Sequence, residues 1–251
     1  MVEKGSHVEK EGKLGRVLLT GANGRIGNIL QESLPAQFDV VTLDMHGKES
    51  DNHFTVDISD FDALKAAFAK AQPIDYIIHL AGNPNADASW EDVLKNNIVG
   101  TRNIYACARK FGVKKIVLAS STHLVGAYEG YPTKSPFERP ITPLDEPRPD
   151  SYYGVSKGFG ELLAREYYDL YGIESICIRI GSLGDTDQPD SPYEKLWLSY
   201  ADAAQVFEKA LLADVPFGIY FATSDNGDGI YDIATTKKDL GFNPIDGTRR
   251  T

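Results

Sequence analysis

Cysteine, methionine and tryptophan are scarce in this sequence, with two of each among 251 residues. Cys107 and Cys177 lie inside apolar stretches, without the spacing of metal ligands. We interpret them as small buried hydrophobic residues of a protein in a reducing compartment. The sequence therefore predicts neither a disulfide framework nor a metal site.

Long hydrophobic runs are also missing. The first sixteen residues, MVEKGSHVEKEGKLGR, are charged throughout and lack the apolar centre of a signal peptide, and no later run approaches the length of a membrane span. We expect a cytoplasmic protein that does not bind membranes, with a flexible or disordered N-terminus over residues 1–14.

Positive charge is in deficit, with 26 Lys and Arg against 36 Asp and Glu, for a formal net charge of −10. This balance argues against nucleic acid and anionic membranes as general partners. An anionic ligand would have to be held by local groups.

Strand and helix patterns alternate along the chain, which predicts an α/β protein with a Rossmann-type, doubly wound parallel sheet. We expect one NAD-binding domain over residues 15–251, with a small C-terminal substrate-binding appendage formed mainly after residue 181. The predicted strands are 17–20, 40–43, 53–56, 76–80, 115–119, 174–180 and 217–221. The predicted helices follow Gly24 and cover 59–71, with Ser59 as the N-cap, and then 91–111, 153–171, 200–213 and 233–240. The stretch 128–149, rich in proline and charge, is predicted to be a loop that could cover a substrate.

The stretch VLLTGANGRIG, residues 17–27, carries three regularly spaced glycines between a strand pattern and a helix pattern. Gly21 and Gly24 would let the backbone turn sharply and approach a pyrophosphate, and Gly27 would allow close packing of helix on strand. The anion would lie at the helix N-terminus. The spacing G-x-x-G-x-x-G differs from G-x-G-x-x-G, and a glycine-rich turn without a cofactor is the alternative.

Tyr153 and Lys157 are four residues apart and lie on one face of a predicted helix. A tyrosine is a poor base at neutral pH unless a nearby cation favours the phenolate, which Lys157 could do. Ser121 follows a predicted strand, where its hydroxyl could bind a reacting oxygen. An exposed Tyr and Lys, and a serine in a turn, remain the alternative for each residue taken alone.

Several motifs occur together and in order: TGANGRIG at 20–27, HLAG at 79–82, NNIVGT at 96–101, SS at 120–121 and YGVSK at 153–157. Together they resemble the extended short-chain dehydrogenase/reductase superfamily, also described as the NAD-dependent epimerase/dehydratase family. SSTHLVGAY, RIGS at 179–182 and WLSYAD at 197–202 further resemble uronate dehydrogenases and short-chain-type NAD-dependent glucose-6-phosphate dehydrogenases. The resemblance covers residues 15–182.

The resemblance implies that Tyr153 is the catalytic base, that Lys157 tunes it and holds the nicotinamide ribose, that Ser121 positions the reacting oxygen, and that Asn97 supports the Lys157 side. The implied cofactor is NAD, because Asp44 would bind both ribose hydroxyls and repel a 2′-phosphate. The residues expected to bind NAD are Gly21, Asn23, Gly24, Arg25, Ile26, Gly27, Asp44, Asp57, Ile58, Leu80, Ala81, Gly82, Tyr153 and Lys157. Asp57 and Ile58 correspond to the adenine contact.

The residues expected to bind the substrate are Ser121, Thr122, His123, Ser182 and Lys195. Two of them depart from the uronate dehydrogenases, which have asparagine in place of Thr122 and an arginine near Lys195. The implied reaction is NAD-dependent oxidation of C1 of an acidic cyclic monosaccharide to a lactone, with a hexuronate first and a hexose 6-phosphate second. A sugar-nucleotide epimerase or dehydratase and a non-catalytic NAD sensor are the alternatives. The superfamily also implies a homodimer formed through helices 91–111 and 153–171.

Overall fold

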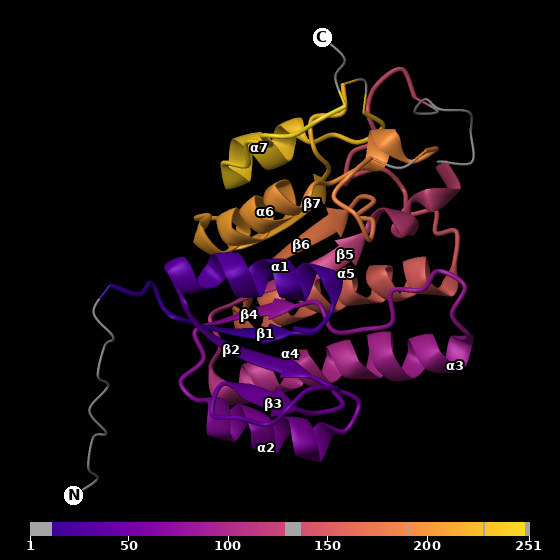
Figure 1. The fold of residues 1–251 in the computed structure, drawn as a ribbon. Coiled ribbons are helices and arrows are strands. Elements are labelled where there is room, and N and C mark those ends of the chain that lie inside the picture. Colours follow the sequence, from indigo (N-terminus) through magenta and orange to yellow (C-terminus); the bar gives the residue numbers. More distant parts are fainter. Residues whose placement is uncertain (1–11, 129–136, 190, 228, 249–251) are drawn as a thin grey trace, which may run out of the picture.

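The computed structural model describes residues 12–128, 137–189, 191–227 and 229–248. Its centre is a seven-stranded sheet in the order β3-β2-β1-β4-β5-β6-β7, in which every pair of neighbours is parallel. Helices cover both faces (Figure 1). The predicted doubly wound Rossmann fold is therefore confirmed. Most of the N-terminus predicted to be flexible, residues 1–11, lies outside the described residues.

The strands are β1 Arg16–Thr20, β2 Asp39–Asp44, β3 His53–Thr55, β4 Tyr76–His79, β5 Lys115–Ser121, β6 Glu174–Ile180 and β7 Phe217–Ala222. The α-helices are α1 Arg25–Ser33, α2 Phe61–Ala71, α3 Trp90–Val93, α4 Gly100–Phe111, α5 Tyr152–Tyr171, α6 Tyr200–Leu212 and α7 Ala234–Leu240. A π-helical segment, Leu94–Val99, joins α3 to α4.

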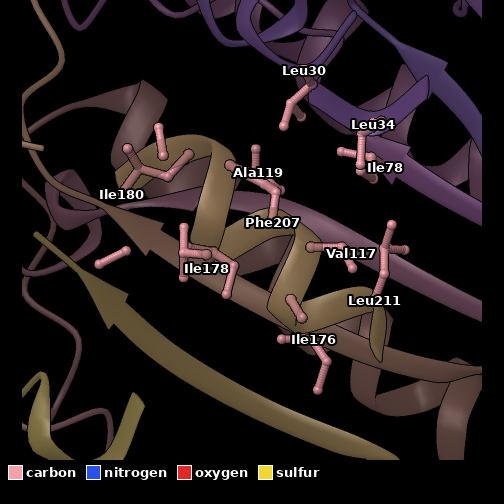
Figure 2. Close-up of a cluster of buried hydrophobic side chains, with 14 of the residues drawn as sticks. Leu30, Leu34, Ile78, Val117, Ala119, Ile176, Ile178, Ile180, Phe207 and Leu211 are labelled. Atoms are coloured by element: carbon pink, nitrogen blue, oxygen red, sulfur yellow. The ribbon is translucent and has the colours of Figure 1, made fainter. Parts of the chain in front are cut away.

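The core lies on both faces of the sheet. On one face, Leu30 of α1, Leu34 directly after α1, and Phe207 and Leu211 of α6 pack against apolar side chains of the central strands, as Figure 2 shows. On the other face, α2, α4 and α5 bury their own apolar stripes. Because both faces are covered, the strands are nearly continuous apolar runs, as is usual in parallel sheets. Cys107 and Cys177 are free and buried in the second cluster.

The strand order reverses between β1 and β4. From β1 the chain builds β2 and β3 on one side, and from β4 it builds β5, β6 and β7 on the other. In open α/β sheets a crevice forms outside the carboxyl ends of the strands at such a switch point. The loops that follow β1 and β4 begin with Gly21 and Leu80, so the glycine turn and the HLAG motif meet there.

The start of α2 and the interior of the predicted helix 91–111 differ from prediction. Asp60, not Ser59, is the N-cap of α2, since its side chain accepts a hydrogen bond from the Ala63 backbone. Ser59 instead donates its hydroxyl to Asp57. The predicted helix 91–111 is interrupted by the π-helical segment, which the sequence analysis did not anticipate. Its predicted stop is confirmed, since Gly112 has a φ of 71°.

A smaller apolar cluster joins the segments that follow β5, β6 and β7. It consists of Val125, Tyr128, Ile141, Leu196, Phe221, Ile230 and Tyr231. In the predicted loop 128–149, residues 129–136 lie outside the described residues, and the described part touches this cluster through Ile141. None of the helices in the described ranges is both long and apolar enough to cross a membrane.

Candidate active site

A cavity of about 740 Å³ opens at the carboxyl ends of the strands. Most of the residues predicted to bind cofactor or substrate line it. They are Gly21, Asn23, Gly24, Arg25, Ile26, Gly27, Asp44, Asp57, Ile58, Leu80, Ala81, Gly82, Ser121, His123, Tyr153, Lys157 and Ser182. The other three, Asn97, Thr122 and Lys195, do not lie on its wall.

The glycine turn has no room for side chains. Gly21 has a φ of +71°, and a Cβ there would lie 2.6 Å from the Ala81 nitrogen. A Cβ on Gly27 would lie 2.3 Å from the Ala22 oxygen, so helix α1 could not pack as closely on β1. Gly24 is the N-cap of α1. The backbone amides at the start of α1 therefore face the cavity with no side chain covering them, which fits a pyrophosphate.

Asp44, at the end of β2, is held in place by the glycine turn. Its carboxylate accepts hydrogen bonds from the backbone N–H of Asn23 at 3.0 Å and of His46 at 3.1 Å. The Asn23 side chain in turn donates to the His46 carbonyl at 2.7 Å. A fixed carboxylate at this end of the turn fits a pair of ribose hydroxyls.

Asp57 and Ile58 line the cavity beyond Asp44. The Asp57 carboxylate lies 2.9 Å from Lys95 Nζ and accepts two hydrogen bonds from Ser59. Partial burial acts to raise the pKa of Asp57, but the hydrogen bonds from Lys95 and Ser59 outweigh it, so the pKa lies below its ordinary value. The Ile58 side chain packs against Gly100, where a Cβ would lie only 2.5 Å from it. This close contact explains the glycine of the NNIVGT motif.

Arg25 links the glycine turn to the segment after β6. Its guanidinium donates to the Leu183 carbonyl at 2.6 Å and forms an ion pair with Asp185. The hydroxyl of Tyr200 on α6 also donates to the carbonyl of Asp185, at 2.9 Å. Arg25 thus lines the cavity as predicted, while its charge is already paired.

Tyr153 and Lys157 lie one turn apart in α5, which begins at the N-cap Ser151. The Lys157 ammonium is 5.2 Å from the centre of the Tyr153 ring and donates to the Ala119 carbonyl at 2.8 Å. Because Ala119 is in β5, two residues before Ser121, this hydrogen bond brings the cation and the serine together at the same end of the cavity. The arrangement suits proton transfer at the tyrosine hydroxyl.

Asn97 lies in the π-helical segment and is 4 % exposed. Its amide clamps Asn83 in both directions, accepting from the Asn83 N–H at 2.7 Å and donating to the Asn83 carbonyl at 3.0 Å. It also donates at 3.1 Å to Ser156 Oγ, which donates at 2.6 Å to the Tyr153 carbonyl. Asn97 therefore supports the tyrosine turn of α5 from behind the cavity wall. The hydrogen bonds of Asn97 thus reach α5 at Ser156, and Ser156 connects them to the Tyr153 backbone.

His123 stands beside the tyrosine, with their rings edge to face at 5.5 Å. Its Nδ1 lies 2.9 Å from the Asp150 carboxylate, and its backbone N–H donates to Ser121 Oγ at 3.2 Å. The Asp150 side chain fills the space beside Gly126, where a Cβ would lie 2.0 Å from Asp150 Oδ2. The pair fixes the plane of the histidine at the cavity wall.

The predicted substrate residues Thr122, Ser182 and Lys195 have different surroundings. Thr122 is buried, 5 % exposed, and its side chain is not on the wall. Ser182 is on the wall, held by backbone hydrogen bonds to Leu196 and Leu198. Lys195 directly precedes Leu196 but is not on the cavity wall, so its proposed role as the anchor for an acidic group is not supported by its position.

His79, in the HLAG motif, is wholly buried behind the site. Its ring nitrogens are hydrogen-bonded to Thr20 Oγ1 at 2.8 Å and Thr101 Oγ1 at 3.1 Å. Burial, assisted by the positive charge of Lys157, lowers the pKa of His79 to about 3. The ring is therefore neutral at physiological pH and ties β4 to β1 and α4.

Several residues of the cavity wall were not predicted from the sequence. They are Leu43, Met45, His46, Val56, Asn83, Pro84, Asn96, Ala119, Ser120, Ile180, Gly181 and Leu183. Most of them flank a residue that was predicted, at the end of the same strand. The rule that carboxyl ends of parallel strands share one edge would have found them.

Fold and cavity together define a dinucleotide-binding oxidoreductase with a tyrosine and lysine pair. The chain matches the NAD dependent epimerase/dehydratase family over residues 17–206. It is 35 % identical to a NAD-dependent glucose-6-phosphate dehydrogenase of Haloferax volcanii, over 92 % of this chain and 94 % of that protein. It is 32 % identical to an L-arabinose 1-dehydrogenase (NAD(P)(+)) of the same organism, over 94 % and 98 %.

Among solved structures, a mutant uronate dehydrogenase from Agrobacterium tumefaciens in complex with NAD superimposes with a TM-score of 0.80 at 31 % identity, covering 93 % of this chain and 86 % of that one. The chain therefore belongs to the NAD-dependent epimerase/dehydratase family. It is an NAD-dependent oxidoreductase that acts on a CH–OH group.

Proposed function

We propose that this protein oxidises a cyclic monosaccharide at its anomeric carbon, C1, and releases a lactone. The observation that carries the proposal is that Lys157, 5.2 Å from the centre of the Tyr153 ring, lines a single cavity together with Tyr153, Ser121 and the glycine turn. The named relatives that cover most of the chain act on sugars, which supports the same substrate class.

The roles of the residues follow from their positions. NAD would be held by the glycine turn and Asp44, and when bound it supplies a nicotinamide ring that accepts a hydride. Tyr153 takes the proton of the C1 hydroxyl at its phenolic oxygen. The Lys157 ammonium lies beside the Tyr153 ring, 5.2 Å from its centre. Ser121 Oγ binds the reacting oxygen, and Asn97 with Ser156 keeps the tyrosine turn in place.

We further propose an acidic monosaccharide as the substrate, with a hexuronate first and a hexose 6-phosphate second. The support is the similarity to a uronate dehydrogenase and to a glucose-6-phosphate dehydrogenase. A neutral aldose is the alternative to an acidic monosaccharide. It is favoured by the cavity itself, where, within the described ranges, the Lys and Arg side chains on the wall are Arg25, paired with Asp185, and Lys157, placed for catalysis.

The test is NADH formation, followed by absorbance, on a panel of galacturonate, glucuronate, glucose 6-phosphate, neutral aldoses and UDP-sugars. We expect an acidic monosaccharide to give the largest kcat/KM. Faster turnover of neutral aldoses would show that the substrate is a neutral aldose and not an acidic monosaccharide. Conversion of UDP-sugars without net NADH would point to an epimerase and contradict the proposed reaction.

A further inference from the structure

A buried ion pair lies behind the catalytic end of the cavity. Glu161 of α5 and Arg179 of β6 form two hydrogen bonds, Nε to Oε1 at 2.9 Å and Nη2 to Oε2 at 2.8 Å. Their side chains are 5 % and 2 % exposed. Ser120, at the end of β5, donates its hydroxyl to Glu161 Oε1 at 2.6 Å. One carboxylate therefore connects one helix with two strands.

Each member of this network stands close in the chain to a residue of the proposed active site. Glu161 lies one helical turn beyond Lys157 and two turns beyond Tyr153. Ser120 directly precedes Ser121 and itself lines the cavity. Arg179 is three residues before Ser182. A shift of α5 against β5 and β6 would thus move the base, the serine and the sugar-binding wall relative to one another.

Stability alone does not account for the pair. Removing two charges from water is costly, and well-packed apolar residues of similar volume often serve a core equally well. Arg179 Nη1 is buried without a hydrogen-bond partner among the described residues. The Arg179 guanidinium lies over the Phe221 ring, 5.3 Å from its centre. This contact does not supply a hydrogen-bond acceptor for Nη1. The network thus fixes geometry at a cost in free energy.

We propose that Glu161, Arg179 and Ser120 form a positioning unit that holds Tyr153 and Lys157 in register with Ser121 and Ser182. The unit contacts neither cofactor nor sugar through its charges. It acts through the three elements that carry the reacting groups. This inference rests on the proposed function, since it assigns the unit to the oxidation at C1.

The test replaces the pair by apolar residues in the double variant Glu161→Met with Arg179→Leu. We expect kcat to fall roughly 10- to 100-fold, because small misplacements of reacting groups cost about this much. The NAD dissociation constant should stay within about twofold, and the denaturation midpoint should be equal or higher. A kcat within twofold of wild type would overturn the proposal.

A control pair lies at the opposite end of the same two strands. Lys115 of β5 and Glu174 of β6 lie 3.1 Å apart, with the lysine side chain 5 % and the glutamate side chain 44 % exposed. They are at the amino ends of the strands, away from the cavity. The double variant Lys115→Met with Glu174→Leu should keep kcat within about twofold of wild type. An equal loss of kcat in both double variants would mean that any change in these strands disturbs turnover, and would contradict a dedicated unit.

A second variant keeps the test decisive if the first double variant does not fold. Ser120→Ala removes the hydrogen bond to Glu161 and leaves the ion pair intact. We expect kcat to fall about 3- to 10-fold with an unchanged denaturation midpoint. Unchanged kcat in Ser120→Ala would overturn the proposal.

A spectroscopic readout separates this inference from the proposed function. In protein with ¹³C-labelled tyrosine rings, the Tyr153 signal is assigned by its loss in Tyr153→Phe. It should be single and sharp in the wild type and broadened or split in Glu161→Met with Arg179→Leu, whatever sugar is oxidised. If no sugar on the panel is oxidised but this signal changes, the proposed function fails and the positioning unit stands. An unchanged signal contradicts the unit.

Discussion

Among single residues, Tyr153 is the one whose hydroxyl the proposed reaction requires. Its ring is packed between Lys157 and His123, so Tyr153→Phe keeps these contacts and removes only the phenolic oxygen. We expect kcat to fall roughly 10²- to 10⁴-fold, the usual scale for a positioned acid or base. NAD affinity, measured by titration, should be nearly unchanged. Near-normal turnover would remove Tyr153 from the mechanism.

Asp44 is predicted to set the choice between NAD and NADP. Asp44→Ala removes a charged acceptor and leaves the Asn23 and His46 amides without it. We expect NAD binding to weaken by about 1.5–3 kcal/mol, and the preference over NADP to narrow. Titrating both cofactors onto wild type and variant gives the difference directly. Equal affinity for the two cofactors in the wild type would show that Asp44 does not discriminate.

At the scale of elements, Gly27 controls how closely α1 lies on β1. In Gly27→Ala the new methyl group would meet the Ala22 carbonyl at 2.3 Å, and the contact is with backbone, which cannot rotate away. We expect NAD binding to be lost and the free energy of unfolding to fall by about 1–3 kcal/mol. Calorimetric titration and denaturant melts measure the two effects.

Gly112→Ala is the control for Gly27→Ala. Gly112 also has a special conformation, with a φ of +71°, but a Cβ there would have nothing within 4 Å. Its cost should be limited to backbone strain of about 1–2 kcal/mol, with NAD binding intact. Loss of NAD binding in both variants would mean that destabilisation, not the glycine turn, is responsible.

The elements were largely predictable because their signals are local. Gly112 and Gly172 ended two helices as predicted, both with positive φ. The three glycines of the turn are also a local signal, and their spacing was enough to predict where the cofactor would bind. By contrast, the π-helical segment Leu94–Val99 adds a single residue within an otherwise helical stretch, and the apolar pattern of residues 91–111 was read as one continuous helix.

Contacts between distant segments were not predictable from the sequence alone. The neighbours of Asn97 come from positions 83 and 156, and their pairing depends on how the loop after β4 meets α5. Lys195 was assigned to the cavity by resemblance alone, and in the irregular segment between β6 and α6 a shift of one or two residues is enough to move a side chain off the wall. Asp60 replaced Ser59 as a cap because either residue fits the cap pattern and only the start of α2 decides between them.

For the whole molecule, His79 predicts an acid-sensitive stability. Because the pKa of His79 is about 3 when folded and about 6.5 when unfolded, only the unfolded chain takes up its proton as the pH falls below 6.5. Stability is thus unaffected by this group above pH 6.5 and decreases below it, by about 2 kcal/mol at pH 5. Denaturant melts at pH 7 and pH 5 measure it. In His79→Gln the difference between the two pH values should shrink, and a wild type equally stable at both would contradict the argument.

The outer face of α5 and of the π-helical segment exposes an apolar patch. It consists of Trp90, Leu94, Tyr152, Val155 and Leu162, with Leu162 75 % exposed. The rings of Trp90 and Tyr152 are in contact at 5.6 Å, so the patch is continuous from α3 to α5. We propose that a second copy of the chain covers this patch. In a two-fold symmetric dimer the same patch of each subunit would meet, so apolar side chains would contact apolar side chains.

Sedimentation tests the homodimer. Leu162→Glu should shift the wild-type dimer to monomer, because it places a charge on the most exposed residue of the patch. Ile245→Glu, at a residue 69 % exposed that follows the segment packed on α6, is the control and should leave the dimer intact. A monomeric wild type, or a dimer that tolerates Leu162→Glu, would rule out this interface.

The π-helical segment Leu94–Val99 also bears on how this chain should be compared and edited. A π turn holds one residue more than an α turn, so it behaves as a single-residue insertion that both flanking helices tolerate. Deleting one residue from it would give an unbroken helix with both flanks in register, and the fold would survive. What would be lost is the extra residue of the π turn, which places the buried Asn97 amide against Asn83 and Ser156. In a sequence alignment, the position of a one-residue gap in this segment decides whether Asn97 is matched to the corresponding amide. In a redesigned chain, the residue that is deleted decides whether the Asn97 amide is kept.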